Sequence, residues 1–413
     1  MRARPLLLLA ALCACCAQIQ AGPLTDALAQ ARRYDAQYLQ ALAERDANQN
    51  NADQAGTAYF PTFQGSYSQL ETESSTRHTY TLTQPLISAD RYATWQESEP
   101  RELLATATFE QREQDLSQRL LKAWSELLRN HEGLRLNRAK IEALEKQAQS
   151  ARRAFELGQG TVTDVRDAQV RLDQARADTL TLEAQIGAAR RQLSAITGQP
   201  AQALQLDVPR ASRTVVLQPL ESYLDSGLKS NPPLRVARQN QRLAEINVQR
   251  ADWVVLPTVS AVVMRTESAG VQNNYAGVSV SLPLQAGSYY QMKGAAANAS
   301  KSQEAARDAE LRTRLEVERL WTLVRAGLAE IEIRLEAIRS AELSVEANER
   351  SFRGGVRSQI DVLNSIQTLY QVQQDYVSAV LTLADNYLNL LLQSAAPVDT
   401  AVAQVQTVLF PTP

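Results

Sequence analysis

The chain has few of the residues that enzymes and metal sites use. Its only cysteines, Cys13, Cys15 and Cys16, lie in one short apolar segment near the start, and its only histidines are His78 and His131. A mature chain without that segment can form no disulfide, thiolate or cysteine metal site. No HExxH motif, phosphate-binding loop or nucleophile elbow is present. We therefore expect a protein that is not an enzyme and has no catalytic residues, metal site or cofactor.

Glycine and proline are also sparse, at 16 and 15 of 413 residues, and the net charge is only −2. Alanine, glutamine, arginine, glutamate and leucine dominate, which is typical of long helices and coiled coils. The balanced charge argues against a chain that coats nucleic acid. After the first segment, no apolar run approaches the roughly 20 residues of a membrane-spanning helix. Any part of the chain that enters a membrane is therefore expected to do so as strands.

The first segment predicts export. Arg2 and Arg4 precede the apolar run 6–16, and small residues up to Ala21 follow. This pattern is typical of a secretory signal peptide, here residues 1–21. Residues 12–15 also partly resemble a lipoprotein box, so lipidation at Cys15 stays open as an alternative to plain cleavage after Ala21.

The remaining chain is an internal duplication. The run from Phe155 to Asp164 recurs from Phe352 to Asp361, at a shift of 197 residues (352 − 155). This predicts a first structural repeat at 22–210 and a second at 211–396, and leaves a tail at 397–413. The tail is too short and polar for a domain, and we expect it to be disordered.

The sequence of each half predicts a helix, a β-hairpin, a very long helix, a break and another helix, in that order. The first helices are expected at 24–58 and 220–255, and the long ones at about 91–153 and 291–350. Pro100 predicts a kink or a late start in the first long helix. Period-two alternation predicts hairpins at about 62–86 and 258–284. Four strands cannot close a barrel, so membrane insertion would require oligomers, and three copies would supply twelve strands.

The duplicated turns, Phe155 to Asp164 and Phe352 to Asn364, resemble those of the outer-membrane efflux and secretion channel family typified by TolC. The resemblance covers nearly the whole mature chain. It implies a mainly α fold with a small transmembrane β part, built from a duplicated repeat. It also implies a homotrimer with an α-helical tunnel and a shared 12-strand β-barrel, in the outer membrane of a Gram-negative bacterium with a large periplasmic portion.

The resemblance also implies partners and a role. The partners are outer-membrane lipid, a periplasmic adaptor (membrane fusion) protein, and an inner-membrane ABC exporter or drug pump. The end of the chain looks more like the branch that serves type I (ABC exporter-driven) protein secretion. A multidrug efflux channel remains an alternative, and a periplasmic coiled-coil adaptor or scaffold is a further one.

Residues of a periplasmic gate follow from the same resemblance. Thr163 and Asp164 match one side of the links that hold the family's closed state, and Arg357 matches their basic partner. Asp361 matches an acidic ring that faces the pore axis. The family's tyrosine is Phe352 here, and its second acidic position is Asn364, so the sequence predicts a looser gate.

Helix capping is the competing interpretation of the two aspartates. Thr161 precedes Asp164 by three residues, and Ser358 precedes Asp361 by three, which is the spacing of a capping box. Arg357 and Asp361 are also four apart and could pair within one helix. The gating and capping roles are compatible at a helix start.

Overall fold

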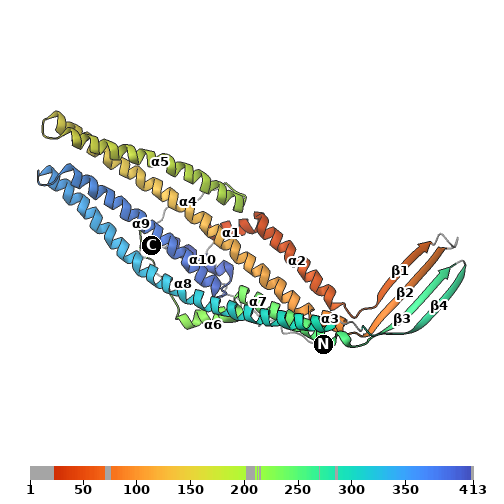
Figure 1. Cartoon of the computed structure of the whole chain (residues 1–413). Coiled ribbons are helices and arrows are strands. Elements are labelled where there is room, and N and C mark those ends of the chain that lie inside the picture. Colours follow the sequence, from red (N-terminus) through yellow and green to blue (C-terminus); the bar gives the residue numbers. More distant parts are fainter. Residues whose placement is uncertain are drawn as a thin grey trace, which may run out of the picture.

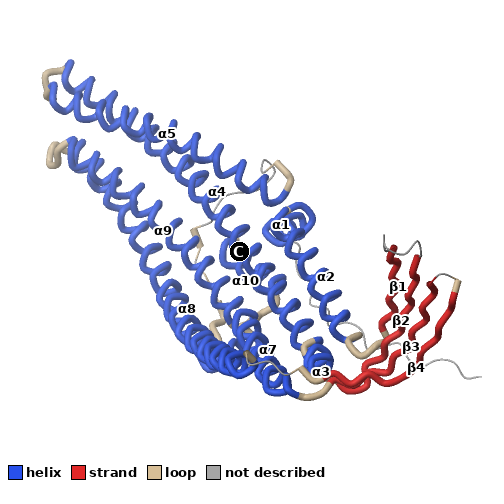
Figure 2. The backbone as a smooth tube through the Cα atoms, turned by 45° about the vertical axis from the view of Figure 1, so that its right-hand side comes forward, coloured by secondary structure: helices blue, strands red, loops and turns tan. Residues whose placement is uncertain are grey.

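The computed structural model describes residues 23–69, 76–200, 210–211, 213, 215–268, 270–283 and 287–410. Long helices occupy one end of the elongated molecule, and a small sheet projects from the other end (Figures 1 and 2). The expected signal peptide and its three cysteines lie outside the described residues.

The two halves contain the same order of long elements. The first half comprises α1 (Pro23–Tyr34), α2 (Ala36–Gly56), β1 (Thr62–Gln69), β2 (Thr76–Ile87), α3 (Ala89–Gln96), α4 (Ser98–Glu156) and α5 (Val162–Thr197). The second half comprises α6 (Leu220–Ser230), α7 (Pro232–Asp252), a 3-10 turn (Trp253–Val255), β3 (Thr258–Ser268), β4 (Val271–Ser281), α8 (Ser288–Arg353), α9 (Gln359–Gln393) and α10 (Val398–Leu409). The hairpins α4–α5 and α8–α9 form the helical arm (Figure 1).

The single helix expected at 24–58 is wrong, because the chain breaks at Asp35 into α1 and α2. The Asp35 carboxylate accepts a hydrogen bond from the Tyr38 backbone N–H at 2.8 Å and so caps α2. The guanidinium of Arg119 in α4 donates two more, at 3.0 and 2.9 Å. The break therefore supplies a buried carboxylate that joins the start of the chain to α4.

The single helix expected at 220–255 is also wrong, because it breaks at Asn231. The buried Asn231 side chain accepts from the Leu234 N–H at 3.2 Å, and its amide donates to the Gln393 carbonyl at 3.0 Å. Pro232 then occupies the first position of α7, where a proline is favoured. The corner between α6 and α7 is thus fixed to the end of α9.

The long helices are α4, with 59 residues, and α8, with 66. Pro100 lies in the first turn of α4, where its missing N–H has no helical acceptor to lose. Of the two expected effects of Pro100, the structure shows the late start: the long helix begins at Ser98, and residues 91–96 belong to the separate helix α3. None of the described helices combines the length and the apolar character that crossing a bilayer requires.

The four strands form one antiparallel sheet in the order β1-β2-β3-β4, so each half contributes one hairpin. Leu82 of β2 lies opposite Val263 of β3, and Val263 lies opposite Ala276 of β4. Apolar residues of neighbouring strands therefore share one face of the sheet, as period-two alternation requires. In the described chain, β1 and β4 are the sheet edges, and each pairs on one side only.

The expectation of a disordered tail is wrong, because residues 398–409 form α10. This amphipathic helix buries Val402, Val405 and Leu409 in the main apolar core, which also contains Trp124 of α4. Its Asp399 pairs with Arg32 of α1 at 2.8 Å. The apolar face of α10 is too short to define a domain, but it gains enough contacts from α1, α4 and α9 to be ordered.

Candidate functional site

The two turns at the far end of the helical arm have the same structure. Gly158 and Gly355 adopt positive φ angles of 72° and 74°. The N–H three residues beyond each last helical position donates to the carbonyl five residues earlier, from Gln159 to Ala154 at 2.8 Å and from Val356 to Ser351 at 2.9 Å. Both are Schellman endings, which favour glycine because its missing Cβ permits the left-handed conformation. Figure 1 shows the two turns at the same end of the molecule.

Both aspartates of the predicted gate form capping boxes. Asp164 Oδ2 accepts from the Thr161 backbone N–H at 2.9 Å and from its hydroxyl at 2.7 Å. Asp361 Oδ2 accepts from the same two groups of Ser358, at 3.0 and 2.8 Å. The Ser358 hydrogen bonds hold the pKa of Asp361 below its usual value. Both side chains are therefore fixed at a helix start, and the lowered pKa favours the ionised form of Asp361.

The basic residue of the predicted gate, Arg357, lies near Asp361 of the same chain. Arg357 Nη1 lies 4.0 Å from Asp361 Oδ1, with side chains that are 57% and 35% exposed. Thr163 is exposed and Phe352 is half-buried. Among the described residues of one chain, no hydrogen bond or ion pair joins Arg357 to Thr163 or Asp164. A link of that kind would have to come from another copy.

The last predicted residue, Asn364, joins the two helical hairpins. Its Oδ1 accepts a hydrogen bond from Arg171 Nη2 of α5 at 2.9 Å. Close by, Gln359 Nε2 donates to Gln147 Oε1 of α4 at 3.0 Å. The buried Leu363 packs into the small apolar cluster between α4 and α5. Sequence reasoning missed Arg171, Gln147 and Gln359, because their partners lie 193 and 212 residues away in the chain.

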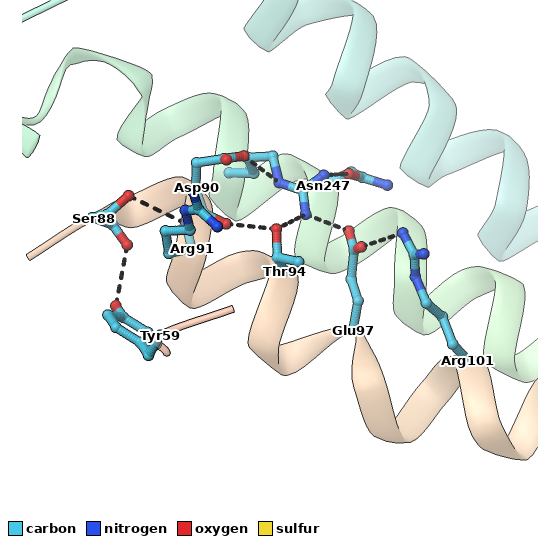
Figure 3. A network of polar contacts seen from close by, with 9 residues as sticks. Tyr59, Ser88, Asp90, Arg91, Thr94, Glu97, Arg101 and Asn247 are labelled. Carbon is cyan, nitrogen blue, oxygen red and sulfur yellow. Dashed lines mark hydrogen bonds and ion pairs between the residues drawn. The ribbon is translucent and has the colours of Figure 1, made fainter. Parts of the chain in front are cut away.

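A second polar cluster lies where the sheet meets the helices (Figure 3). Glu97, between α3 and α4, is 2% exposed, and its carboxylate pairs with Arg101 at 2.6 Å and with Arg250 of α7 at 2.7 Å. Arg250 also donates to Thr94 at 3.4 Å and lies 3.4 Å from Asp90. No motif or spacing in the sequence predicts this cluster. It joins the base of α4 to the second half of the chain.

The described residues form no candidate metal-binding site. No group of three or more histidine, cysteine, aspartate or glutamate side chains there could hold an ion. At the far end of the helical arm lie two hydrogen-bonded turns that carry charged, mostly exposed side chains. Such an arrangement can form and break contacts between copies or with a partner.

Comparisons with known proteins support the duplicated fold. The model of the Outer membrane efflux protein family matches residues 27–199 and again 223–395, which confirms the duplication. Proteases secretion protein PrtF of Dickeya chrysanthemi is 29% identical over 94% of this chain and 92% of its own length. Outer membrane protein TolC of Vibrio cholerae is 26% identical over 92% of this chain and 93% of its own length.

A solved structure shares the fold. The outer membrane protein VceC of Vibrio cholerae superimposes with a TM-score of 0.77 at 17% identity, over 91% of this chain and 96% of that one. The expected fold and the location in the outer membrane of a Gram-negative bacterium are thereby confirmed. The family consists of channel proteins rather than enzymes. This chain belongs to the outer membrane efflux protein family.

Proposed function

We propose that the chain is the exit duct of a type I protein secretion system in the outer membrane. An inner-membrane ABC exporter would drive transport, and a periplasmic adaptor would connect the exporter to the duct. The observation that carries this proposal is the similarity to a proteases secretion protein over more than nine-tenths of both chains. The 59- and 66-residue helices support it, because they would reach roughly 90–100 Å into the periplasm at 1.5 Å per residue.

The working form is a homotrimer with its sheet in lipid. The edge strands β1 and β4 each leave one row of backbone groups unpaired in the single chain. Unpaired groups in hydrocarbon cost several kcal/mol each, so the edges must pair with other copies. Three copies would close twelve strands into a barrel and place their helices around one tunnel. The halves 22–210 and 211–396 would then be the two repeats of each subunit.

The gate of this duct lies at the two turns. Thr163 and Asp164 of one subunit would bind Arg357 of a neighbour, and Asp361 would face the tunnel axis. Phe352 cannot donate a hydroxyl hydrogen bond. These contacts are exposed and individually weak, so a docking adaptor could open them.

Replacing one gate residue tests this arrangement. Arg357→Asp should raise the single-channel conductance in a planar bilayer, because it turns an attraction into a repulsion at three positions. Arg353→Asp, at the exposed end of α8, is the matched control and should leave conductance unchanged. Unchanged conductance in a folded Arg357→Asp trimer would remove Arg357 from the gate.

Drug efflux is the second candidate, and the family description favours it. Deletion of the gene in its host separates the two roles. If the chain serves type I secretion, the deletion strain loses at least one protein from the culture supernatant. An unchanged set of secreted proteins together with increased drug sensitivity would reject secretion and support efflux.

A further inference from the structure

One face of the four-stranded sheet changes from apolar to polar along the strands. One apolar residue from each strand lies in a row across this face, and the four are Phe63, Leu82, Val263 and Ala276. Towards the helices, β3 and β4 continue the same face with Val259, Ala261, Val278 and Val280. We call this the apolar face. The other face of β1 and β2 is lined by hydroxyl and amide side chains, namely Thr62, Gln64, Ser66, Ser68, Thr79, Thr81 and Thr83.

The apolar face becomes polar two residues beyond Val263. The next row across the four strands consists of Gly65, Tyr80, Arg265 and Asn274. The row after that consists of Tyr67, His78, Glu267 and Gln272. Arg265 is six residues from Val259, which is about 20 Å along the strand. The two tyrosines fit the aromatic girdle that flanks the apolar band of a membrane-embedded sheet.

Arg265 carries an exposed positive charge at this boundary. Its Nη2 donates to Gln272 Oε1 at 2.7 Å, which is the single hydrogen bond of this side chain to a described residue. Glu267 follows on the same face, but no carboxylate of the described residues lies within ion-pair distance of Arg265. A guanidinium has five N–H donors, so most of those of Arg265 are available to a ligand.

The position of Arg265 along the sheet indicates which ligand it meets. Figures 1 and 2 show that the hairpin ends of the strands lie farthest from the helices. With the helices in the periplasm, as proposed above, these ends lie in the outer leaflet of the membrane. Headgroups begin where the apolar band ends, and that level is the row of Arg265. Arginine binds phosphate oxygens through two parallel N–H donors.

We propose that the apolar face ends in a binding site for the phosphate group of an outer-leaflet glycolipid. Arg265 binds the phosphate, Asn274 and Tyr80 flank it, and the apolar rows towards the helices contact the acyl chains. This inference rests on the proposed function and identifies the lipid partner of its sheet. The negative charge of a phosphorylated glycolipid complements the exposed guanidinium. A trimer would contain three such sites around its rim.

Titration of the purified full-length protein in neutral detergent tests the site. The probes are lipid A, a glycolipid with two phosphate groups, and its dephosphorylated form, and native mass spectrometry measures the bound fraction. The parent should bind lipid A about tenfold more tightly than the dephosphorylated form, because a hydrogen bond to a charged group contributes that much. Arg265→Gln should remove this preference, and Arg265→Lys should retain part of it.

Arg77→Gln is the matched control. Arg77 is also exposed and lies at the hairpin end of the neighbouring strand β2. It lies opposite Ser268, an odd number of residues from Arg265, so its side chain is on the other face of the sheet. Arg77→Gln should therefore keep the preference of the parent. Equal losses in Arg77→Gln and Arg265→Gln would show that net charge attracts the lipid, and would overturn the assignment to the apolar face.

The remaining outcomes are equally decisive. An unchanged preference in Arg265→Gln would overturn the site. If that variant does not assemble, Asn274→Asp replaces it, because a carboxylate opposite Arg265 should pair with the guanidinium and remove the preference. Displacement of lipid A by an equal concentration of inorganic phosphate would overturn the lipid as the source of the phosphate.

The proposed function is tested separately from this site. The titration uses neither exporter nor adaptor, so a failed lipid site leaves protein secretion as proposed. Conversely, a deletion strain with normal secretion would reject the secretion role, while the measured preference for lipid A would still support the site.

Discussion

Among the contacts that join the two halves, the buried carboxylate of Glu97 can be tested most directly by mutation. Glu97→Gln keeps the side-chain size but removes the charge between Arg101 and Arg250, whose side chains are 45% and 29% exposed. Breaking a fully buried ion pair costs about 3–5 kcal/mol. Because both arginines retain contact with water, we place the loss at about 2–3 kcal/mol, which approaches two hydrogen bonds to charged groups.

Chaotrope unfolding of the purified protein in detergent, followed by circular dichroism, measures this loss. Glu99→Gln is the control, because Glu99 is exposed in the first turn of the same helix. It should change the free energy of unfolding by no more than about 0.5–1 kcal/mol. If Glu97→Gln destabilises no more than Glu99→Gln, the cluster does not join the halves in the way that its geometry indicates.

Four further predictions concern other contacts. Burial raises the pKa of Asp35, but hydrogen bonds from Arg119 and Tyr38 outweigh it and lower the net pKa. Asp35→Asn should therefore destabilise at neutral pH; in pH-dependent unfolding, the difference from the parent should shrink as pH falls below about 3.9 and vanish below the lowered folded-state pKa. Burial raises the pKa of Glu113 despite Arg32, so its charge opposes folding, and Glu113→Gln should be neutral or stabilising at pH 7 in the same experiment. Gly355→Ala should cost about 1–2 kcal/mol because φ is positive, whereas Gly294→Ala inside α8 should stabilise by about 0.5–1 kcal/mol; equal signs in thermal unfolding would refute this. Removal of residues 398–413 deletes four valines and a leucine of the core, a gross loss of roughly 7–15 kcal/mol, and should abolish trimers in the membrane fraction on immunoblots.

The sequence alone determined the features that depend on short-range patterns. The duplication is visible in the sequence because both copies contain the aromatic residue, the glycine and the aspartate of the turn at the far end of the helical arm. Gly158 and Gly355 are predictable because a Schellman ending favours a residue without a Cβ. The capping boxes at Asp164 and Asp361 follow from a three-residue spacing, and the strands from period-two alternation.

Only the tertiary structure decided what those elements contact. Asp35 broke a helix that its neighbours favour, because its carboxylate gains Arg119 from 84 residues away. Asn364, expected only as a weakened acidic position, holds Arg171 across 193 residues. The tail became α10 because a surface built from α1, α4 and α9 was there to bury its valines. Local periodicity records which face of a helix is apolar, whereas the partner of that face depends on how distant segments pack, and no single segment contains that information.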